Sequence, residues 1–349
     1  MLENFQIRGF RCFSDFTISG LKRINLIAGK NAVGKTALLE AIRLYDQPSR
    51  NSLVELLARR DEAVVGKTAW SLETAAPLFF RGLGRESTRT ARFSGLGAAV
   101  DLKVAWYRSG NDGRWVEDPG DQLVGYSDST PLLRLARSEH RSIPLSVPLD
   151  GSELVHLRLS SPPSSGPAYV RSSSLDTTEI VRLFEDVAGT DEENEAIRVL
   201  SWIIPDAERL LTKGAGEERT IYVKRKGRPH PEPLRTFGEG AFRLTGLALA
   251  LFNSRGSVCL IDEIENGIHY ELFDQIWEKL SLLSQELNVQ VFATTHSKDC
   301  IEAFERSYRY PHFDACFHRL ERDKDRIVAI RLDNESYFSV VAGQEHEIR

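Results

Sequence analysis

The feature that most constrains this chain is a phosphate-binding loop near its start. Residues 29–36 read G-K-N-A-V-G-K-T, which fits the pattern G-x-x-x-x-G-K-[ST] at every fixed position. An apolar run, Ile24 to Ala28, precedes the loop and a helix-like run follows it. The loop is therefore expected to join a strand to a helix N-terminus, where anions are favoured. This context predicts a nucleoside triphosphate site in an α/β fold of the P-loop type.

Each part of the loop has a chemical role in that prediction. Glycines let backbone N–H groups turn toward the β-phosphate, the Lys35 ammonium neutralises β- and γ-phosphate oxygens, and the Thr36 hydroxyl can hold Mg²⁺. A GTPase is disfavoured because the chain has no N-K-x-D motif to read guanine, so we expect ATP and Mg²⁺ as cofactors. The candidate nucleotide-binding residues are Gly29, Lys30, Asn31, Ala32, Val33, Gly34, Lys35 and Thr36.

Further along the chain, a second motif supplies the acids that hydrolysis needs. The run S-V-C-L-I-D-E, residues 257–263, is typical of a buried Walker B strand that ends in two carboxylates. Asp262 is expected to act with Thr36 at the metal, and Glu263 to polarise the attacking water. The next apolar strand, residues 289–293, leads into T-T-H-S and places His296 at a neighbouring strand end. A lone strand-end histidine is more often structural, but its place after a Walker B strand favours a sensor of the γ-phosphate.

A fourth motif lies immediately before the Walker B strand. Residues 236–243 read T-F-G-E-G-A-F-R and run into an apolar, helix-like stretch. Two glycines that open a helix expose backbone N–H groups and a positive dipole end to an anion. Alone, such a pair usually forms only a helix cap. Its position in the chain makes it similar to the signature loop of ABC ATPases, which completes the site of the opposite subunit, and the candidates for this contact are Gly238, Glu239 and Gly240.

Taken together, the motifs resemble a short ABC-type ATPase of the OLD/RecF/SMC branch, often labelled AAA family ATPase. The run N-F-Q-I-R-G-F-R-C-F, residues 4–13, resembles the opening strand of that branch, and D-E-I-E-N-G-I-H, residues 262–269, is similar to OLD-type ATPases. The match covers residues 1–46 and 220–300. It implies a three-layer α/β domain with a mostly parallel core sheet, an N-terminal antiparallel subsheet and an α/β insertion lobe.

The resemblance also suggests a contact to the nucleotide base. Arg11 resembles the arginine that follows an aromatic residue in the first strand of this branch, where a guanidinium can stack on adenine. A plain surface arginine is an equal alternative.

Two departures from the ABC pattern affect the prediction. Gly238 occupies the position of the signature serine of many ABC proteins, so the contact in trans would rest on backbone amides, with Glu239 or Arg243 as further candidates. Between residues 48 and 274 the only glutamine is Gln122, in a turn-like D-P-G-D-Q stretch. A standard Q-loop glutamine is therefore not expected, which disfavours a transporter subunit.

Composition narrows the class of protein. The formal net charge of −5, from 45 Lys+Arg and 50 Asp+Glu, gives no global basic field to recruit nucleic acid. The four cysteines lack C-x-x-C spacing and are expected to be reduced packing residues, not metal ligands. No secretory leader pattern opens the chain and no apolar run is long enough to span a membrane. We expect a cytoplasmic protein without a membrane partner.

The predicted organisation has three segments: residues 1–47 as the first half of the ATPase domain, 48–219 as the insertion lobe, and 220–349 as the second half with a terminal hairpin. The expected elements of the lobe are a helix at residues 53–65, strands at 100–107, 115–116 and 154–159, a Ser/Pro loop or hinge at 161–167, and helices at 178–187 and 192–204. No sustained heptad pattern occurs, which excludes long coiled-coil arms.

Two charged segments could suggest further sites. The basic run K-R-K-G-R, residues 224–228, lies on a predicted hairpin, and a solvated turn is favoured over nucleic-acid binding. Asp323-Lys324-Asp325 resembles a Toprim metal site, but the alternation of residues 326–332 predicts a returning strand and a charged hairpin turn. Only 53 residues follow His296, so we expect no Toprim nuclease within this chain.

The sequence thus predicts ATP hydrolysis gated by formation of a homodimer or a higher homo-oligomer. The resemblance implies an anti-phage or toxin–antitoxin setting, in which a small OLD-like ATPase controls a separate effector such as a Toprim nuclease. A RecF-like ATPase that binds DNA is the alternative, and it would need a basic groove and stimulation by DNA.

Overall fold

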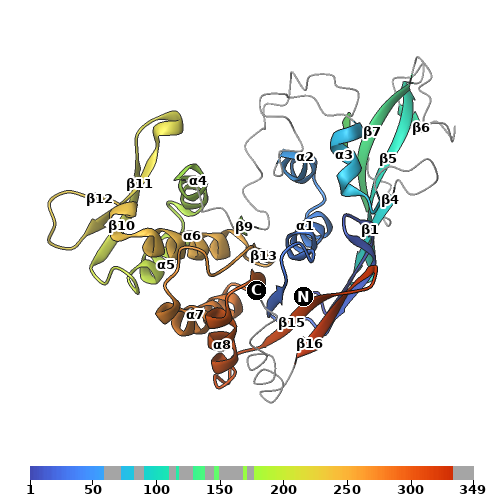
Figure 1. Cartoon of the computed structure of the whole chain (residues 1–349). Helices are drawn as coiled ribbons and strands as arrows, with labels where there is room; N and C mark the ends of the chain where they lie inside the picture. The colour runs from blue at the N-terminus through green and yellow to red at the C-terminus, as the bar shows by residue number, and fades with distance from the viewer. Residues whose placement is uncertain are drawn as a thin grey trace.

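The computed structural model has a six-stranded sheet at its centre, in the order β16-β15-β3-β14-β13-β9 (Figure 1). Five of these strands are parallel, and β16 runs antiparallel beside β15. The structure describes residues 1–58, 72–81, 90–109, 115–117, 129–137, 145–148, 168–170 and 177–332. The strands of the central sheet are β3 (Ile24–Gly29), β9 (Tyr169–Val170), β13 (Val258–Ile261), β14 (Gln290–Thr295), β15 (Ala315–Asp323) and β16 (Arg326–Leu332).

Both faces of this sheet are buried, because successive side chains of a strand point to opposite faces. In β13, Cys259 and Ile261 belong to a hydrophobic core on one face, whereas Val258 and Leu260 belong to a second core on the other face. A strand covered on both faces is expected to be a continuous apolar run, and the apolar stretches before Asp262 and His296 are of this kind.

Helices cover one face, and helices with a second sheet cover the other. The helices of the first core are α4 (Thr177–Val187), α5 (Asp191–Leu200), α6 (Glu239–Asn253), α7 (Phe273–Glu286) and α8 (Lys298–Ser307). The second core contains α1 (Lys35–Asp46) and α2 (Arg50–Ala58). The helix expected after the phosphate loop is α1, and one face of it is buried, with Leu38, Ala41, Ile42 and Tyr45. The three-layer α/β fold with a mostly parallel core sheet is confirmed.

The second sheet is antiparallel and has the order β2-β1-β4-β5-β7-β8, with β6 on β5. The N-terminal antiparallel subsheet that the resemblance implied is present, and it starts with a hairpin in which Phe5 lies opposite Ile18 and Ile7 opposite Phe16. A short helix, α3 (Leu72–Ala75), precedes the later strands. The strands of this sheet are β1 (Asn4–Phe10), β2 (Phe13–Ser19), β4 (Thr90–Gly95), β5 (Ala98–Ser109), β6 (Trp115–Glu117), β7 (Ser129–Arg137) and β8 (Leu145–Pro148).

The segment 48–219, expected as one insertion lobe, is instead divided among three places. Its strands β4 to β8 extend the N-terminal sheet, because β1 pairs with β2 on one edge and accepts β4 on the other. Its strand β9 pairs with β13 of the central sheet, and its helices α4 and α5 pack on α6. A three-stranded sheet follows, formed by β10 (Ala207–Lys213), β11 (Thr220–Arg225) and β12 (Glu232–Pro233). The domain boundaries at residues 47 and 219 stay predictions.

Several expected elements differ in length or lie outside the described residues. Helix α5 ends at Leu200 and not at residue 204, because the N–H groups of Trp202 and Ile203 bond three residues back and tighten the last turn. The predicted helix at 53–65 is described only to Ala58. The predicted strand at 154–159, the Ser/Pro segment at 161–167 and Gln122 lie outside the described residues.

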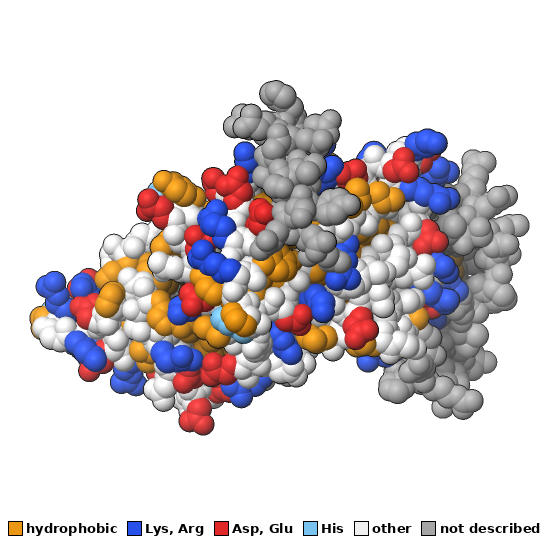
Figure 2. Space-filling view, turned by 90° about the horizontal axis from the view of Figure 1, so that it is seen from below, with side chains coloured by type: hydrophobic (Ala, Val, Ile, Leu, Met, Phe, Trp, Pro, Cys, Tyr) orange, Lys and Arg blue, Asp and Glu red, His pale blue; other side chains and the backbone are white. Residues whose placement is uncertain are grey.

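Both charged segments singled out in the sequence are hairpins. The basic run lies at the turn between β11 and β12, where Arg225 donates two hydrogen bonds to the carboxylate of Asp206. Asp323 pairs with Arg326 across the turn between β15 and β16, as the alternation predicted. Basic and acidic side chains are interspersed on the face shown in Figure 2. Among the described residues, no helix combines the length and apolar character needed to cross a membrane.

Candidate active site

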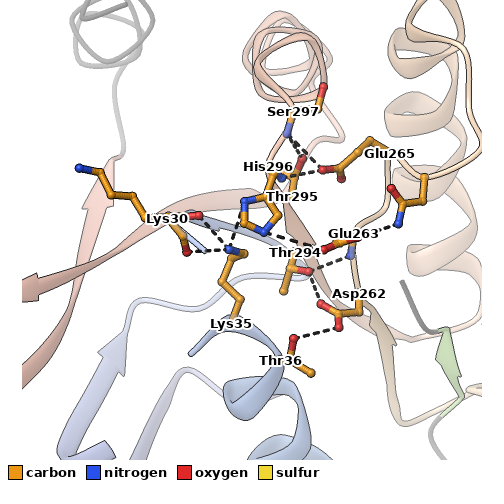
Figure 3. Close-up of polar contacts among 12 residues, drawn as sticks. Lys30, Lys35, Thr36, Asp262, Glu263, Glu265, Thr294, Thr295, His296 and Ser297 are labelled. Atoms are coloured by element: carbon orange, nitrogen blue, oxygen red, sulfur yellow. Dashed lines mark hydrogen bonds and ion pairs between the residues drawn. The ribbon is translucent and has the colours of Figure 1, made fainter. Parts of the chain in front are cut away.

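The phosphate-binding loop connects β3 directly to α1. Its backbone takes positive φ angles at Gly29, Ala32 and Gly34, of 152°, 58° and 106°, and α1 begins at Lys35. Such turns let successive N–H groups face a common centre, which is the geometry that binds phosphate. The Lys35 ammonium donates to the carbonyl oxygens of Gly29 at 2.8 Å and Lys30 at 3.1 Å (Figure 3). The lysine is therefore held over the loop that the sequence assigned to the nucleotide.

Asp262 follows β13 and is held by hydroxyl groups from three other elements. The Thr36 hydroxyl donates to its Oδ2 at 3.0 Å, and the Thr294 hydroxyl, on the neighbouring strand β14, donates to its Oδ1 at 2.6 Å. The Tyr169 hydroxyl, from β9, lies 3.4 Å from Oδ2. No sequence pattern pointed to Thr294 or Tyr169, because each lies far from Asp262 along the chain and both residue types are common in strands.

Thr36 and Asp262 fit a magnesium site in their chemistry. Both present hard oxygen atoms, and Mg²⁺ in nucleotide sites is commonly held by one or two protein oxygens together with phosphate oxygens and water. The described residues contain no group of three His, Cys, Asp or Glu side chains that could hold a metal by themselves.

Glu263 has a strained backbone that its neighbours fix. Its φ angle is 50°, a left-handed value that costs a residue of this type about 1–3 kcal/mol. The Glu263 N–H donates to the Thr294 hydroxyl at 2.8 Å, and its Oε2 accepts from the Asn266 side chain at 2.7 Å. Figure 3 shows the carboxylate turned toward His296. This placement suits a group that must orient a water molecule beside the phosphate loop.

His296 lies between the lysine and the glutamate. Its Nδ1 is 3.4 Å from the Lys35 Nζ, and its Nε2 is 3.9 Å from Glu263 Oε1 (Figure 3). Burial, followed by the nearby Lys35 ammonium, lowers the pKa of the imidazole. A neutral ring in this orientation can accept from Lys35 through Nδ1 and present an N–H toward Glu263 through Nε2. Burial likewise lowers the pKa of Lys35, to about 8, against the opposing effect of three nearby acids.

Glu265 belongs to the same cluster but was not among the predicted site residues. Its Oε1 accepts from the backbone N–H groups of His296 at 2.6 Å and Ser297 at 3.1 Å, at the start of α8. Ser297 caps that helix with its own side chain. A carboxylate at a helix N-terminus is favourable because it meets unpaired N–H groups and the positive dipole end. The only sequence signal for this role was the second glutamate in D-E-I-E.

The predicted signature loop packs against the turn that follows Glu263. Gly238 has a φ angle of 93° and precedes α6, which begins at Glu239. A methyl group added to Gly240 would lie 3.6 Å from the carbonyl oxygen of Gly267, and one added to Gly267 would lie 3.3 Å from the Glu239 side chain. Glu239 also pairs with Arg235 at 2.9 Å. The role of this loop in a partner's site stays a prediction.

Two arginines take positions that the sequence did not foresee. Arg243, considered for the contact in trans, is only 2% exposed, and its guanidinium faces the carbonyl oxygens of Asp262 and Glu263 in its own chain. A side chain so buried is not placed to reach a partner. Arg11 forms a 2.6 Å ion pair with Glu40 of α1, and both side chains are nearly buried. The surface alternative for Arg11 is therefore wrong, while its contact with adenine stays a prediction.

The four cysteines are thiols outside any disulfide, and Cys259, Cys300 and Cys316 are buried, as expected for packing residues. Burial raises the pKa of Cys259 to about 12 and raises that of Cys300 as well. The thiols of Cys259 and Cys300 are therefore protonated and unreactive at neutral pH.

Comparisons with known proteins agree with this geometry. Residues 123–299 match the family described as "AAA domain, putative AbiEii toxin, Type IV TA system", and residues 1–71 match "AAA ATPase domain". An "ATP/GTP phosphatase" of Helicobacter pylori (strain ATCC 700392 / 26695) is 20% identical over 345 residues, with 90% of each chain covered. The crystal structure of an Smc head bound to the C-winged helix domain of ScpA is similar in fold, with a TM-score of 0.52 at 16% identity over 96% of this chain and 99% of that chain.

The match to the first of these families spans half of the chain and contains the Walker B strand and His296, while the second match contains the phosphate loop. The fold, the site and both matches agree on the enzyme class. The chain is an AAA-type ATPase and belongs to the family described as "AAA domain, putative AbiEii toxin, Type IV TA system".

Proposed function

We propose that this ATPase is a switch whose ATP hydrolysis depends on the pairing of two copies. The observation that supports hydrolysis most strongly is the row of contacts from Lys35 through His296 to Glu263, at the carboxyl ends of adjacent strands. The His296 imidazole thus has the Lys35 ammonium, which can bind the phosphates, on one side. On its other side it has the Glu263 carboxylate, which can orient a water molecule. The closeness of Gly240 to the turn after Glu263, where an added methyl group would lie 3.6 Å from the Gly267 carbonyl oxygen, supports a link between the signature loop and the hydrolytic residues.

In this proposal each residue has one task. Lys35 exchanges the loop carbonyl groups for the β- and γ-phosphate oxygens, and the loop N–H groups bind the same phosphates. Thr36 and Asp262 would hold Mg²⁺, which supplies positive charge to the phosphate oxygens. Glu263 orients the attacking water and accepts its proton, and His296 senses the γ-phosphate. The loop of Gly238 to Gly240, from a second copy, completes the site by donating backbone N–H groups.

We further propose that the switch is OLD-like, acts in the cytoplasm, and controls a separate effector protein, such as a Toprim nuclease, in an anti-phage or toxin–antitoxin system. The family description, which names a putative AbiEii toxin and a type IV system, supports this setting. The name of the Helicobacter pylori relative, an ATP/GTP phosphatase, supports triphosphate hydrolysis. The acids that resemble a Toprim metal site, Asp323 and Asp325, belong to the hairpin turn between β15 and β16. This assignment supports an effector that is a separate protein.

The DNA-binding alternative has weaker support. The basic run on the hairpin after β11 is partly neutralised, because Arg225 is paired with Asp206 and also lies 3.8 Å from Glu232. Charges of both signs are mixed on the face shown in Figure 2. The net charge of −5 adds no attraction for phosphate backbones.

The division of labour between Lys35 and Glu263 provides the test. Lys35→Ala should abolish ATP binding, because the phosphates lose their main cation. Glu263→Gln should keep ATP affinity but lower kcat by about a hundredfold or more, the usual contribution of a general base. Equilibrium binding of a fluorescent ATP analogue and the release of phosphate measure the two steps separately. The exposed Glu271 gives a matched control, since Glu271→Gln should leave both unchanged. Equal loss of binding in both site variants would refute the role given to Glu263.

A further inference from the structure

Arg243 is a buried cation next to the hydrolytic residues. It lies in the first turns of α6 and is 2% exposed. Its Nη2 donates to the carbonyl oxygens of Asp262 and Glu263, at 3.3 Å each. Burying a guanidinium is costly unless hydrogen bonds and opposite charges compensate for the lost water. Burial lowers the pKa of this arginine, and Glu179, Asp262, Glu265 and Glu239 oppose that effect.

The contact between Arg243 and the Glu263 carbonyl oxygen complements a second contact, which is made by the Glu263 N–H. Glu263 has its N–H bonded to the Thr294 hydroxyl and its carbonyl oxygen bonded to Arg243. The backbone of Glu263 is thus held from both sides while its φ angle is 50°. A left-handed conformation at such a residue persists only where the surroundings fix it. Thr294 and Arg243 are two groups that do so, one from β14 and one from α6.

Arg243 also connects this strained residue to the signature loop. Helix α6 begins immediately after Gly238, and Arg243 follows Gly240 by less than one turn. Because a helix moves as a rigid unit, a shift of its first turn carries the guanidinium with it. The loop itself lies close to the turn that follows Glu263, since a methyl group added to Gly240 would lie 3.6 Å from the carbonyl oxygen of Gly267. The loop and the guanidinium therefore act on the same short stretch of backbone.

We infer that Arg243 is a positioning residue for ATP hydrolysis: it transmits the position of the signature loop to the backbone of Glu263 in the same chain. This inference rests on the proposed function, since it takes Glu263 as the group that orients water. It adds that a chain whose loop is engaged by a partner's nucleotide has its own glutamate placed for hydrolysis. Communication between the two sites of a pair would then pass through Arg243.

The alternative is that Arg243 only supports the packing of α6. Under that alternative, a variant would lose stability but keep the chemical step, and its effect would not depend on Glu263. A positioning role makes the opposite prediction, because the arginine acts only through Glu263. Residues that act through one another show non-additive effects in a double-mutant cycle.

The experiment uses Arg243→Lys and Arg243→Ala, each alone and combined with Glu263→Gln, with kcat and ATP affinity measured for every variant. We expect Arg243→Ala to lower kcat by about tenfold or more with ATP affinity within about twofold of the parent, and Arg243→Lys to recover part of the loss. In the Glu263→Gln background, Arg243→Ala should cause no further loss of residual hydrolysis. Arg255→Ala, at an exposed arginine just after the end of the same helix, is the matched control and should leave kcat unchanged.

Two results would overturn this inference without touching the proposed function. One is an unchanged kcat in Arg243→Ala, and the other is an equal fractional loss of hydrolysis in the parent and in the Glu263→Gln background. If Arg243→Ala does not fold, the comparison is made with Arg243→Lys, for which the same two results are decisive. The proposed function is judged by a different result, because it fails if Glu263→Gln alone retains hydrolysis at the parent rate.

Discussion

The ammonium of Lys35 is held by the carbonyl groups of its own loop and is 6% exposed. This environment favours the neutral amine, because burial removes the water that stabilises the charge. Burial lowers the pKa of Lys35 to about 8. Phosphate binding requires the charged form, so the affinity for ATP becomes sensitive to pH in a range where an exposed lysine would not titrate.

We therefore predict that ATP affinity is constant from pH 7 to about pH 8 and then falls by about tenfold for each further pH unit. The affinity falls as the pH rises, because the protonated form of Lys35 is the one that binds phosphate. Titration of a fluorescent ATP analogue between about pH 7 and 9.5 measures the effect. Lys35→Arg is the control, because a guanidinium stays charged throughout this range. A flat affinity up to pH 9.5 in the parent protein would contradict the prediction.

Thr294 provides a second test at the residue scale. Its hydroxyl donates to Asp262 and accepts from the Glu263 N–H, and the side chain is fully buried. Thr294→Val keeps the shape but leaves that N–H without its partner, which should lower the free energy of unfolding by about 1–3 kcal/mol. It should also lower kcat, because Glu263 loses one of its backbone restraints.

The control for this variant is Thr245→Val. Thr245 is also buried, but its hydroxyl donates to the carbonyl oxygen of Ala241 within its own helix. Chemical denaturation and phosphate release compare the two variants. Identical kcat values for Thr294→Val and Thr245→Val would show that Thr294 has no part in placing Glu263.

At the scale of residues, the sequence pointed to the candidate nucleotide-binding and hydrolytic residues, but not to the residues that fix their positions. The sequence named five candidates, and the structure brings them together at one edge of the sheet: Lys35, Thr36, Asp262, Glu263 and His296. Each belongs to a motif with fixed local spacing. The sequence did not identify the groups that support these side chains, because they come into contact with the site only after distant strands and helices have packed together. These groups are Tyr169, Thr294, Glu265 and Arg243.

At the scale of elements, the phosphate loop depends on β15 beside it. Gly29 has a φ angle of 152°, and a methyl group added there would lie 2.6 Å from the carbonyl oxygen of Leu320 and 2.9 Å from the Val33 side chain. The clash with Leu320 involves backbone, which yields little. The loop keeps its shape because β15 pairs with β3 in parallel up to Gly29 itself.

Gly29→Ala should therefore move the loop and weaken ATP binding by about tenfold or more, with reduced thermal stability. Gly97→Ala is a matched control, since Gly97 also has a positive φ angle but has open space around its Cα. The control should lose about 1 kcal/mol of stability and no ATP affinity. Calorimetry and nucleotide titration give both quantities. Equal ATP affinity in the two variants would show that β15 does not shape the loop.

The type of most elements could be read from the sequence, but their pairing could not. Local patterns identified β3, α1, α4 and β16, since these signals lie within a few residues. They carried no indication that β4 would pair with β1, or that β9 would join β13. Such pairings bring together residues far apart in the chain, and a local pattern carries no information about the partner of a strand edge.

At the scale of the whole molecule, the proposed switch needs two copies that share each site. Helix α6, with the signature loop at its start, and α1, with the phosphate loop, lie in different layers, in the first and second hydrophobic cores (Figure 1). Two copies arranged head to tail would each offer a signature loop to the other's phosphate loop. Neither copy would then hydrolyse ATP at the full rate alone.

A mixing measurement tests this claim most directly, using Lys35→Ala and Gly240→Trp. Each variant alone should be inactive, because one lacks the phosphate cation and the other blocks the signature loop. A mixed pair has one intact site, so random mixing at equal amounts should restore at most about a quarter of the parent's phosphate release. The recovery is smaller to the extent that the Glu263 of the intact site depends on the blocked signature loop of its own chain. Full activity of Gly240→Trp alone, or no recovery in the mixture at any ratio, would contradict a site shared between two copies.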